Sequence, residues 1–423
     1  MIFKYPIAIS LSPNTDKDDI WQAYKTIMQP WNWKDGTSIK RVEERFKQFE
    51  DVDNPIMFNS GRSALLAILV AFDIGKGDEV LIQAFTCVAV PDAILWAGAN
   101  PIYVDIDDSL NIDPMLLEKH INKKTKAIVV QHTFGIPARI ELIKKIAQKY
   151  NLILIEDCAH SLGATFNGIT LGKFGDATFF SFGRDKVVSS VFGGMATIKP
   201  KFKMQNSKLK KYHENLPYPG TFWIFQQLLH PILLAIILPL YNFQIGKVIL
   251  FASQKFRLLS FPVYEQEKKG TRPEIFPARF PNALAQLILL QLNKLETYNR
   301  QREKNATYYF RQLGKLNNIK LPPKIEGAIY LRFNILMPEA QKLLSLAKER
   351  KILLGNWYRN VIDPIGVDFE KVRYKNEQCP NAERVAKLSL NLPTYPRLTN
   401  SDLKSVVDLI RQVLHAEVDR DTI

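Results

Sequence analysis

The sequence predicts an α/β protein with a mostly parallel central sheet, helices on both faces of that sheet, and a smaller C-terminal α+β domain. Short apolar runs, typical of strands buried on both faces, alternate with segments of helical periodicity. With 423 residues, the chain is long enough for one large domain and a second, smaller one. We expect an N-terminal segment at 1–35, a large domain at 36–320 and a small domain at 321–423.

The first predicted elements lead to a turn that could bind an anion. Residues 1–35 have no clear period and are expected to be irregular, whereas 38–49 has helical spacing with Ser38 as its N-cap. A strand at 56–58 and an apolar helix enclose a turn of small residues around Gly61. The first turn of a helix offers free N–H groups and the positive end of a dipole, so this turn suits a phosphate. An ordinary N-capped buried helix explains the same residues equally well.

Three more strands are expected before the middle of the chain, at 79–82, 102–106 and 127–132, the last followed by a glycine turn. A helix is expected to begin at Phe85, and another covers 141–150. His132 lies near the end of the third of these strands. A ligand role is open for this histidine, but we favour a structural one.

The stretch 153–198 contains the residues with the clearest chemistry. A buried strand ends in Glu156 and Asp157, at the strand end where open α/β sheets bind ligands. A glycine-rich passage and a second strand follow, and Lys186 comes just after that strand. An acid and a lysine so placed are what a pyridoxal phosphate (PLP) site needs. The acid keeps a proton on the pyridine nitrogen, and the lysine holds the aldehyde as a Schiff base.

Four motifs in this stretch closely resemble those of the DegT/DnrJ/EryC1/StrS family of PLP-dependent sugar aminotransferases. They are Glu156-Asp157-Cys158-Ala159-His160-Ser161-Leu162-Gly163-Ala164, Phe174-Gly175-Asp176, Phe180-Ser181-Phe182-Gly183-Arg184-Asp185-Lys186 and Gly193-Gly194. Near the C-terminus, Cys379-Pro380-Asn381-Ala382-Glu383 also matches. The resemblance covers about 36–415 apart from one insert, and it implies the fold of PLP-dependent transferases of fold type I.

The resemblance also implies roles for particular residues. Lys186 is the catalytic lysine. The cofactor-binding residues are Asp157, His160, Ser181, Gly61, Arg62, Ser63 and Cys87. The implied reaction is amino transfer to a nucleotide-linked or lipid-linked keto-sugar in amino-sugar or surface polysaccharide synthesis. Glutamate is the expected amino donor, and a homodimer with shared active sites is the expected assembly.

Four positions depart from the family pattern. Arg62 replaces a threonine, so its guanidinium either bonds the cofactor phosphate or points away and leaves the backbone to do so. Cys87 replaces an aromatic residue that stacks on the pyridine ring, Phe192 replaces a glutamate, and Pro277 replaces an asparagine. These departures leave an alternative open: a non-catalytic or regulatory, membrane-associated relative that keeps the fold.

Composition narrows the partners and the compartment. The net charge of +15 favours an anionic partner, but no motif of a nucleic-acid module is present, so no nucleic acid is expected. The three cysteines form neither a metal-binding spacing nor a disulfide framework. The first residues lack the apolar core of a secretory signal. We expect no metal and a cytoplasmic location.

An insert at 200–262 interrupts the family pattern. No Asp, Glu, Lys or Arg occurs from 215 to 246, and basic residues flank this stretch on both sides. Prolines and polar residues interrupt its apolar centre, so an interfacial helix or a shallow hairpin fits better than a full membrane span. We therefore expect peripheral attachment to the cytoplasmic face of a membrane through 200–262, with packing onto the protein as the alternative.

Overall fold

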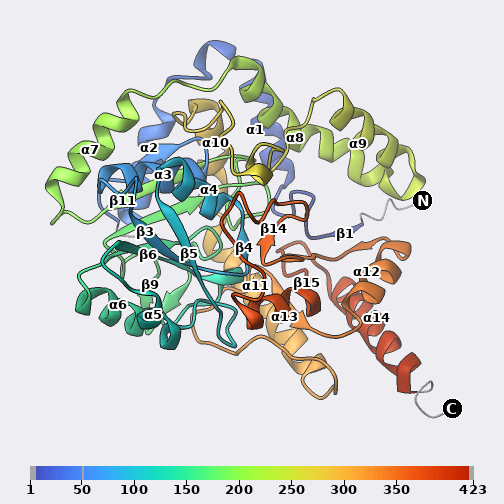
Figure 1. Ribbon diagram of the computed structural model, residues 1–423. Coiled ribbons are helices and arrows are strands. Elements are labelled where there is room, and N and C mark those ends of the chain that lie inside the picture. The colour runs from blue at the N-terminus through green and yellow to red at the C-terminus, as the bar shows by residue number, and fades with distance from the viewer. Residues whose placement is uncertain (1–5, 50–51, 419–423) are drawn as a thin grey trace.

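The computed structural model describes residues 6–49 and 52–418 (Figure 1). Residues 1–5 lie outside the described residues. The expectation that no secretory signal is present rests mostly on these residues. A seven-stranded sheet forms the centre of the large domain, and its strand order is β2-β11-β10-β7-β6-β3-β5. The bounds of these strands, in that order, are Ile56–Phe58, Gly194–Ile198, Ala177–Ser181, Ile153–Asp157, Thr125–Gln131, Glu79–Gln83 and Asn100–Val104.

The register of the sheet brings the predicted site residues to one edge. Strands β10, β7, β6, β3 and β5 run parallel, and β11 is antiparallel to both β10 and β2. Within this register Phe179 is paired with Asp157, so the carboxyl ends of β7 and β10 lie side by side. The segment that begins at Ser181 therefore starts beside Asp157.

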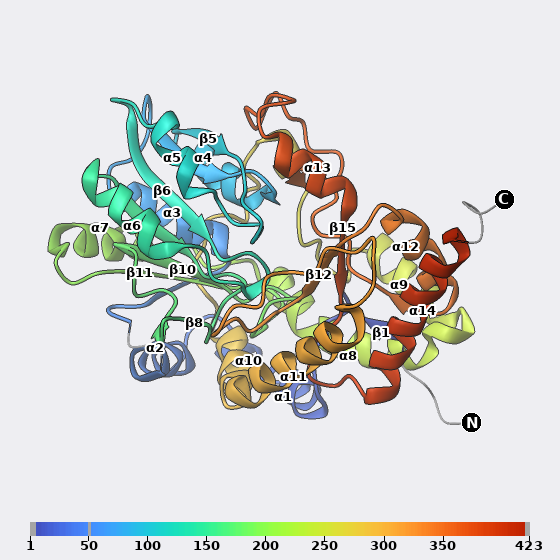
Figure 2. The ribbon, with the colours of Figure 1, turned by 90° about the horizontal axis from the view of Figure 1, so that it is seen from below.

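Alternate residues of the strands enter two separate cores, as expected for a sheet covered on both faces. Leu81, Ile128 and Leu154 pack on one face beneath α2 (Ser38–Phe49), α5 (Pro114–His120), α6 (Ile140–Lys149) and α10 (Asn282–Leu292). Val80 and Ile155 pack on the other face beneath α3 (Gly61–Ala71), α4 (Ala89–Trp96), α7 (Lys203–Glu214) and α13 (Pro380–Leu388). In Figure 2, α2 and α10 lie on one side of strands β10 and β11, and α3 and α4 lie on the other side. The predicted α/β class is confirmed.

Three local predictions are wrong. Ser38 is the first residue of α2 rather than its N-cap. The segment 1–35 is not irregular throughout, because α1 (Lys17–Ile27) begins with a capping box between Asp16 and Asp19. Large apolar residues on both the buried and the exposed sides of α1 obscured its period. The helix expected from Phe85 starts at Ala89, because Thr86 and Cys87 form β4, which pairs with β14 (Ile362–Asp363).

The small domain has its own core around β12 (Phe333–Leu336), β15 (Ser389–Leu392), α12 (Ala340–Glu349) and α14 (Asn400–Val418). The long helix α11 (Leu295–Leu313) enters this core with Tyr309 and Leu313. Strand β1 (Ile7–Ala8) pairs with β13 (Ile352–Leu353), so the N-terminal segment is bound to the small domain.

The insert forms a helical hairpin beside α1. After α7, the first helix of the hairpin, α8 (Thr221–Leu240), contacts α1 and the second helix, α9 (Ile245–Lys255). Figure 1 shows α8 and α9 together at one end of the molecule. Among the described residues, α8 alone is long and apolar enough to cross a membrane, but 44% of its most apolar window is buried in the protein. Trp223 and Ile237 of α8 are core residues, so this part of the insert packs onto the protein.

Candidate active site

A cavity of about 500 Å³ opens at the carboxyl ends of β7 and β10, where β14 and the segment 261–268 also contribute to its wall. Of the eight residues that the family resemblance assigned, seven line it: Gly61, Arg62, Cys87, Asp157, His160, Ser181 and Lys186. The eighth, Ser63, does not. Its hydroxyl donates to Asn59 at 2.7 Å and its backbone N–H donates to Ser60, so Ser63 is part of the helix cap rather than of the cavity wall.

Lys186 is held by a histidine whose tautomer follows from its partners. Nδ1 of His160 accepts the backbone N–H of Phe134 at 3.3 Å, so the proton of the neutral ring is on Nε2. Nε2 lies 2.7 Å from Nζ of Lys186. With its proton directed at Nζ, His160 favours a neutral amine that accepts this hydrogen bond. Burial lowers the pKa of His160 well below its usual value, and burial also lowers the pKa of Lys186.

The two acids at the end of β7 have different environments. Asp157 lines the cavity and is buried, which raises its pKa to about 6. Glu156 points to the other side and accepts hydrogen bonds from the backbone N–H of Gly172 and Gly175, at 2.8 and 2.6 Å. His132 lies 3.2 Å from Glu156 and accepts the N–H of Ala138 on its other nitrogen. Glu156 therefore fixes the glycine-rich loop, and His132 is structural, as favoured from the sequence.

His132 and Glu156 also come close to Cys158, near enough for one cation to bridge the three. The hydrogen bonds just described already use His132 and Glu156, so the grouping is explained without a metal.

The N-terminus of α3 forms one end of the cavity. Ser60 caps the helix, and its backbone packs so closely against Gly194 that a Cβ there would lie 2.3 Å from the Ser60 carbonyl carbon. A Cβ on Gly61 would come within 3.0 Å of the Cβ of Ser181. The glycines thus keep a compact concave surface of backbone N–H groups and the Ser181 hydroxyl, which suits a phosphate.

Arg62 belongs to the wall but not to this phosphate cradle. Its guanidinium forms an ion pair with the fully buried Glu267, donates to the carbonyl of Pro262 at 2.8 Å and lies 4.7 Å from the centre of the Phe276 ring. Of the two alternatives for Arg62, the structure favours the second, in which the side chain is engaged elsewhere and the backbone offers the anion site.

These features fit PLP. The cavity has room for the cofactor, and a buried acid is present for the ring nitrogen. A lysine whose pKa is lowered by burial is present for the aldehyde, and a helix N-terminus with a hydroxyl is present for the phosphate. Cys87 lines the cavity where the family has an aromatic ring, and burial raises the pKa of its thiol. Aromatic surface comes instead from Trp357 and Tyr358, which line the same cavity.

The sequence reasoning missed the contribution of the small domain. Arg332 lines the cavity, forms an ion pair with Asp185 and stacks on Trp357, with its guanidinium carbon 3.6 Å from the ring centre. Asp363 of β14 also lines it. The position of Asp185, next to the cofactor lysine, was the available signal, but nothing in the sequence around Arg332 indicated its partner.

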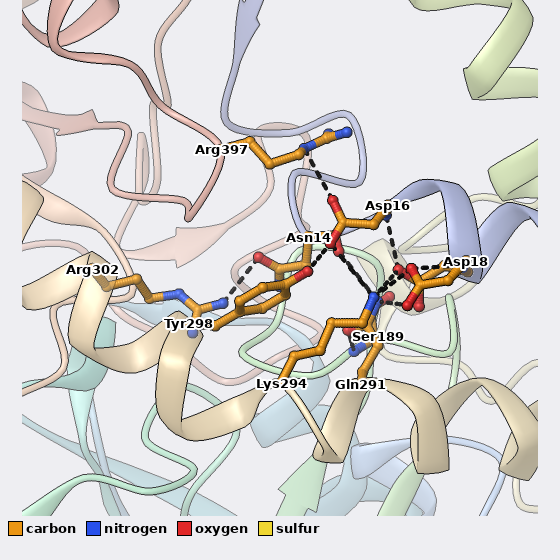
Figure 3. Close-up of polar contacts among 10 residues, drawn as sticks. Asn14, Asp16, Asp18, Ser189, Gln291, Lys294, Tyr298, Arg302 and Arg397 are labelled. Atoms are coloured by element: carbon orange, nitrogen blue, oxygen red, sulfur yellow. Dashed lines mark hydrogen bonds and ion pairs between the residues drawn. The ribbon is translucent and has the colours of Figure 1, made fainter.

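The loop that carries Lys186 is fixed by residues from distant parts of the chain (Figure 3). Asn14 donates to the carbonyls of Lys186 and Val187 at 2.6 and 3.2 Å. Arg302, which is fully buried, donates to Asn14 at 2.9 Å and to the Val187 carbonyl at 3.1 Å. Gln291 accepts the N–H of Ser189 at 2.9 Å. The N-terminal segment and the α10–α11 region therefore hold the lysine in place together.

Comparison with known proteins places this fold and site in one class. The model of the DegT/DnrJ/EryC1/StrS aminotransferase family matches residues 14–215 and 253–411. The chain belongs to this family. The gap in the match, 216–252, contains all of α8 and most of α9.

Individual relatives cover almost the whole chain. A pleiotropic regulatory protein of Geobacillus stearothermophilus is 27% identical over 94% of each chain. A GDP-perosamine synthase of Caulobacter vibrioides is 26% identical over 95% of this chain and 97% of its own. The structure of NtdA from Bacillus subtilis with bound cofactor PMP is similar in fold, with a TM-score of 0.75, 21% identity, and coverage of 98% of this chain and 86% of NtdA. The predictions of the family, the fold, a transaminase and its PLP cofactor are confirmed.

Proposed function

We propose that this protein transfers an amino group to a keto-sugar, with Lys186 as the catalytic lysine. The observation that carries the proposal is the arrangement of Lys186, His160 and Asp157 at the carboxyl ends of adjacent parallel strands. When bound, PLP supplies an aldehyde that accepts an amino group and a ring that stores the electrons of a broken C–H bond.

The chain's own residues have separate tasks. His160 directs its Nε2 proton at Nζ of Lys186 and so keeps a lone pair on the amine. When Nζ is released, it is the base that moves the proton of the substrate carbon. The carboxylate of Asp157 would hold a proton on the ring nitrogen of PLP, and Ser181 with the N-terminus of α3 would bind its phosphate.

The amino acceptor is a sugar attached to a nucleotide, which is supported by the name of the GDP-perosamine synthase. A lipid-linked keto-sugar is the second candidate, because of the insert. We propose glutamate as the amino donor, by analogy within the family.

The test has two parts. Borohydride reduction of the holoenzyme followed by peptide mapping should place the pyridoxyl label on Lys186, and a label on another lysine would contradict the assignment. Incubation with labelled glutamate and nucleotide-linked 4-keto and 3-keto sugars should give an amino sugar. Lys186→Ala should lose this activity while its circular dichroism spectrum stays unchanged.

A regulatory relative without catalysis is the second candidate, favoured by the name of the Geobacillus protein and by Phe192 and Pro277. The visible spectrum separates the two candidates. If the protein is a catalyst, it should absorb at about 410–430 nm after PLP is added and lose this band when glutamate is added. A protein that never shows the band supports the regulatory role.

We also propose a homodimer. The exposed side of α1 and of the turn after it carries Trp21, Tyr24, Met28 and Trp31, the last of them 75% exposed. Such a patch on a soluble protein marks a docking surface, and a second copy is the partner that the family resemblance implies. Trp31→Glu should shift sedimentation toward the monomer. A wild-type protein that sediments as an active monomer would count against it.

Finally, we propose that the α8–α9 hairpin attaches the enzyme to the cytoplasmic face of an anionic membrane. One side of α9 exposes Ile245, Val248 and Phe251 at helical spacing. Lys247 and Lys255 flank this apolar side. An anionic membrane would bind the apolar side chains through its acyl region and the lysines through its headgroups.

Flotation with phosphatidylglycerol vesicles tests this attachment. Val248→Ser with Phe251→Ser should abolish flotation without changing the melting temperature, because both side chains are about two-thirds exposed. Ile237→Ser, at a fully buried position, serves as the contrasting variant that lowers stability. Wild-type protein that stays with the soluble fraction at low salt rules out the attachment.

A further inference from the structure

The cationic side chains of the cavity wall differ in whether a carboxylate pairs with them. Besides Lys186, four line the cavity: Arg62, Arg184, Lys268 and Arg332. Three of these have a carboxylate partner, which is Glu267 for Arg62, Glu265 for Lys268 and Asp185 for Arg332. Among the residues that the structure describes, no ion pair joins Arg184 to a carboxylate.

Arg184 is nevertheless held in a defined position. Its Nη2 donates to the hydroxyl of Ser260 at 3.0 Å. That hydroxyl uses its single proton to donate to Oε1 of Gln227 at 2.7 Å, and Gln227, which is fully buried, donates to the carbonyl of Trp223 at 2.8 Å. Every link after Arg184 comes from the insert, on α8 or just after α9. The insert therefore acts as the support of a residue in the active-site wall.

The surroundings of Arg184 leave its charge uncompensated. The guanidinium carbon lies 5.7 Å from the centre of the Phe192 ring, on the apolar wall that Phe192 forms with Trp223. Burial lowers the pKa of Arg184 to about 10, although Asp185 next to it in sequence acts in the opposite direction. Asp185 is already paired with Arg332. A guanidinium in a partly apolar cavity wall, with donors left over, is suited to a planar or tetrahedral oxyanion.

We infer that Arg184 binds an oxyanion of a substrate in this cavity, and that the insert positions it for this task through Ser260 and Gln227. Two groups have the required chemistry, the carboxylate of the amino donor and a phosphate of the sugar carrier. The cofactor phosphate is a different case, because the N-terminus of α3 and Ser181 already form a cradle for it. The inference rests on the proposed function, since it assigns a binding contact to the substrates of that reaction.

Binding measurements on the PLP-loaded enzyme test the inference without turnover. Calorimetry with glutarate probes the carboxylate, and calorimetry with GDP and UDP probes the phosphate. Arg184→Gln should weaken the binding of either glutarate or the nucleotides by about 10-fold or more, as expected for the loss of a charged hydrogen-bonding partner. Arg184→Lys should restore part of the loss, because it keeps the charge but not the fork of donors. Weaker binding of glutarate would show that Arg184 binds the carboxylate of the amino donor. Weaker binding of GDP and UDP would show that it binds a phosphate of the sugar carrier.

Two further variants complete the experiment. Ser260→Ala releases Arg184 and should weaken the same ligand by a smaller factor. Lys268→Gln removes an equal charge from the same wall and should change little, because that charge is already paired. The inference is overturned if Arg184→Gln leaves all probes unchanged, if wild type binds none of them, or if only the affinity for PLP falls. These outcomes are separate from failure of the proposed function, which is absence of amino transfer by the wild type.

Discussion

Nε2 of His160 lies 2.7 Å from Nζ of Lys186, and the backbone N–H of Phe134 fixes the proton of His160 on that nitrogen. Two consequences follow for Lys186. It accepts a hydrogen bond rather than donating one, so its neutral form is favoured. It is also oriented before any ligand arrives, because His160 stacks against Phe134, with the ring centres 5.8 Å apart.

Replacing His160 should therefore change the pH dependence of cofactor capture. In His160→Asn the hydrogen bond that favours the neutral amine is lost, so the midpoint of the rate profile should rise by up to about 1 pH unit. Stopped-flow absorbance of cofactor-free protein mixed with PLP, from pH 6 to pH 10, measures this midpoint. An unchanged profile would show that the contact does not control the amine.

Asp157 should destabilise the cofactor-free protein at neutral pH. Its pKa in the folded protein is about 6, raised by burial from the ordinary 3.8. A raised pKa means that the folded state binds the proton more tightly than the unfolded state. The stability that this tighter proton binding contributes is present in full below pH 3.8 and is lost as the pH rises through 6.

Asp157→Asn should consequently make the cofactor-free protein more stable at pH 7.5, by up to about 3 kcal/mol. The gain should shrink as the pH falls from 6 to 4. Denaturant unfolding of both proteins at several pH values measures it. The same variant should lose amino transfer, because the amide carries no negative charge for the ring nitrogen. A variant less stable than wild type at pH 7.5 would contradict the argument.

The sequence predicted most of the fold and most of the assigned residues that line the cavity, for identifiable reasons. Strand β7 and Asp157 were predictable because an apolar run before an acid is a local signal. The helix at 38–49 was placed correctly by its spacing, although Ser38 is its first residue rather than its N-cap. Arg332 and Asn14 could not be predicted in the same way. Each reaches the Lys186 loop from a part of the chain more than 140 residues away, and no local pattern marks such a contact.

Three departures from the family pattern, at Arg62, Phe192 and Pro277, have one structural explanation. Phe192 packs against Trp223 of α8, with the ring centres 5.4 Å apart, and also against Phe276. Arg62 lies on the same Phe276, which is followed by Pro277. Three unusual positions thus meet beside the insert. Each looked like an isolated loss in the sequence, because the apolar surface that accommodates them comes from α8.

The ion pair between Arg62 and Glu267 gives a sharp test of this interpretation. Arg62→Thr restores the family residue but leaves Glu267, which is fully buried, without its partner. We expect a loss of about 3–5 kcal/mol in the free energy of unfolding. Arg62→Thr with Glu267→Gln should recover much of it. If Arg62 does not hold the cofactor phosphate, the double variant should bind PLP about as well as the wild type, which absorbance titration can show. A large loss of PLP affinity in the double variant would assign Arg62 to the phosphate after all.

The last prediction concerns Asn14, which holds the Lys186 loop together with Arg302; Figure 3 shows the contact between these two side chains. Asn14→Ala removes the donor to the carbonyls of Lys186 and Val187, and it leaves Arg302 without one of its acceptors. We expect a loss of about 1–3 kcal/mol in stability and, because the loop can then shift, slower capture of PLP at every pH.

The matched control is Gln22→Ala. Gln22 also joins the N-terminal region to α10, through Gln286 at 2.7 Å, but it does not touch the lysine loop. Gln22→Ala should lower stability without slowing cofactor capture. If the two variants slow capture equally, the effect belongs to the N-terminal segment as a whole. If neither does, the loop keeps its geometry without Asn14, and Arg302, which also donates to the Val187 carbonyl, is the residue that fixes it.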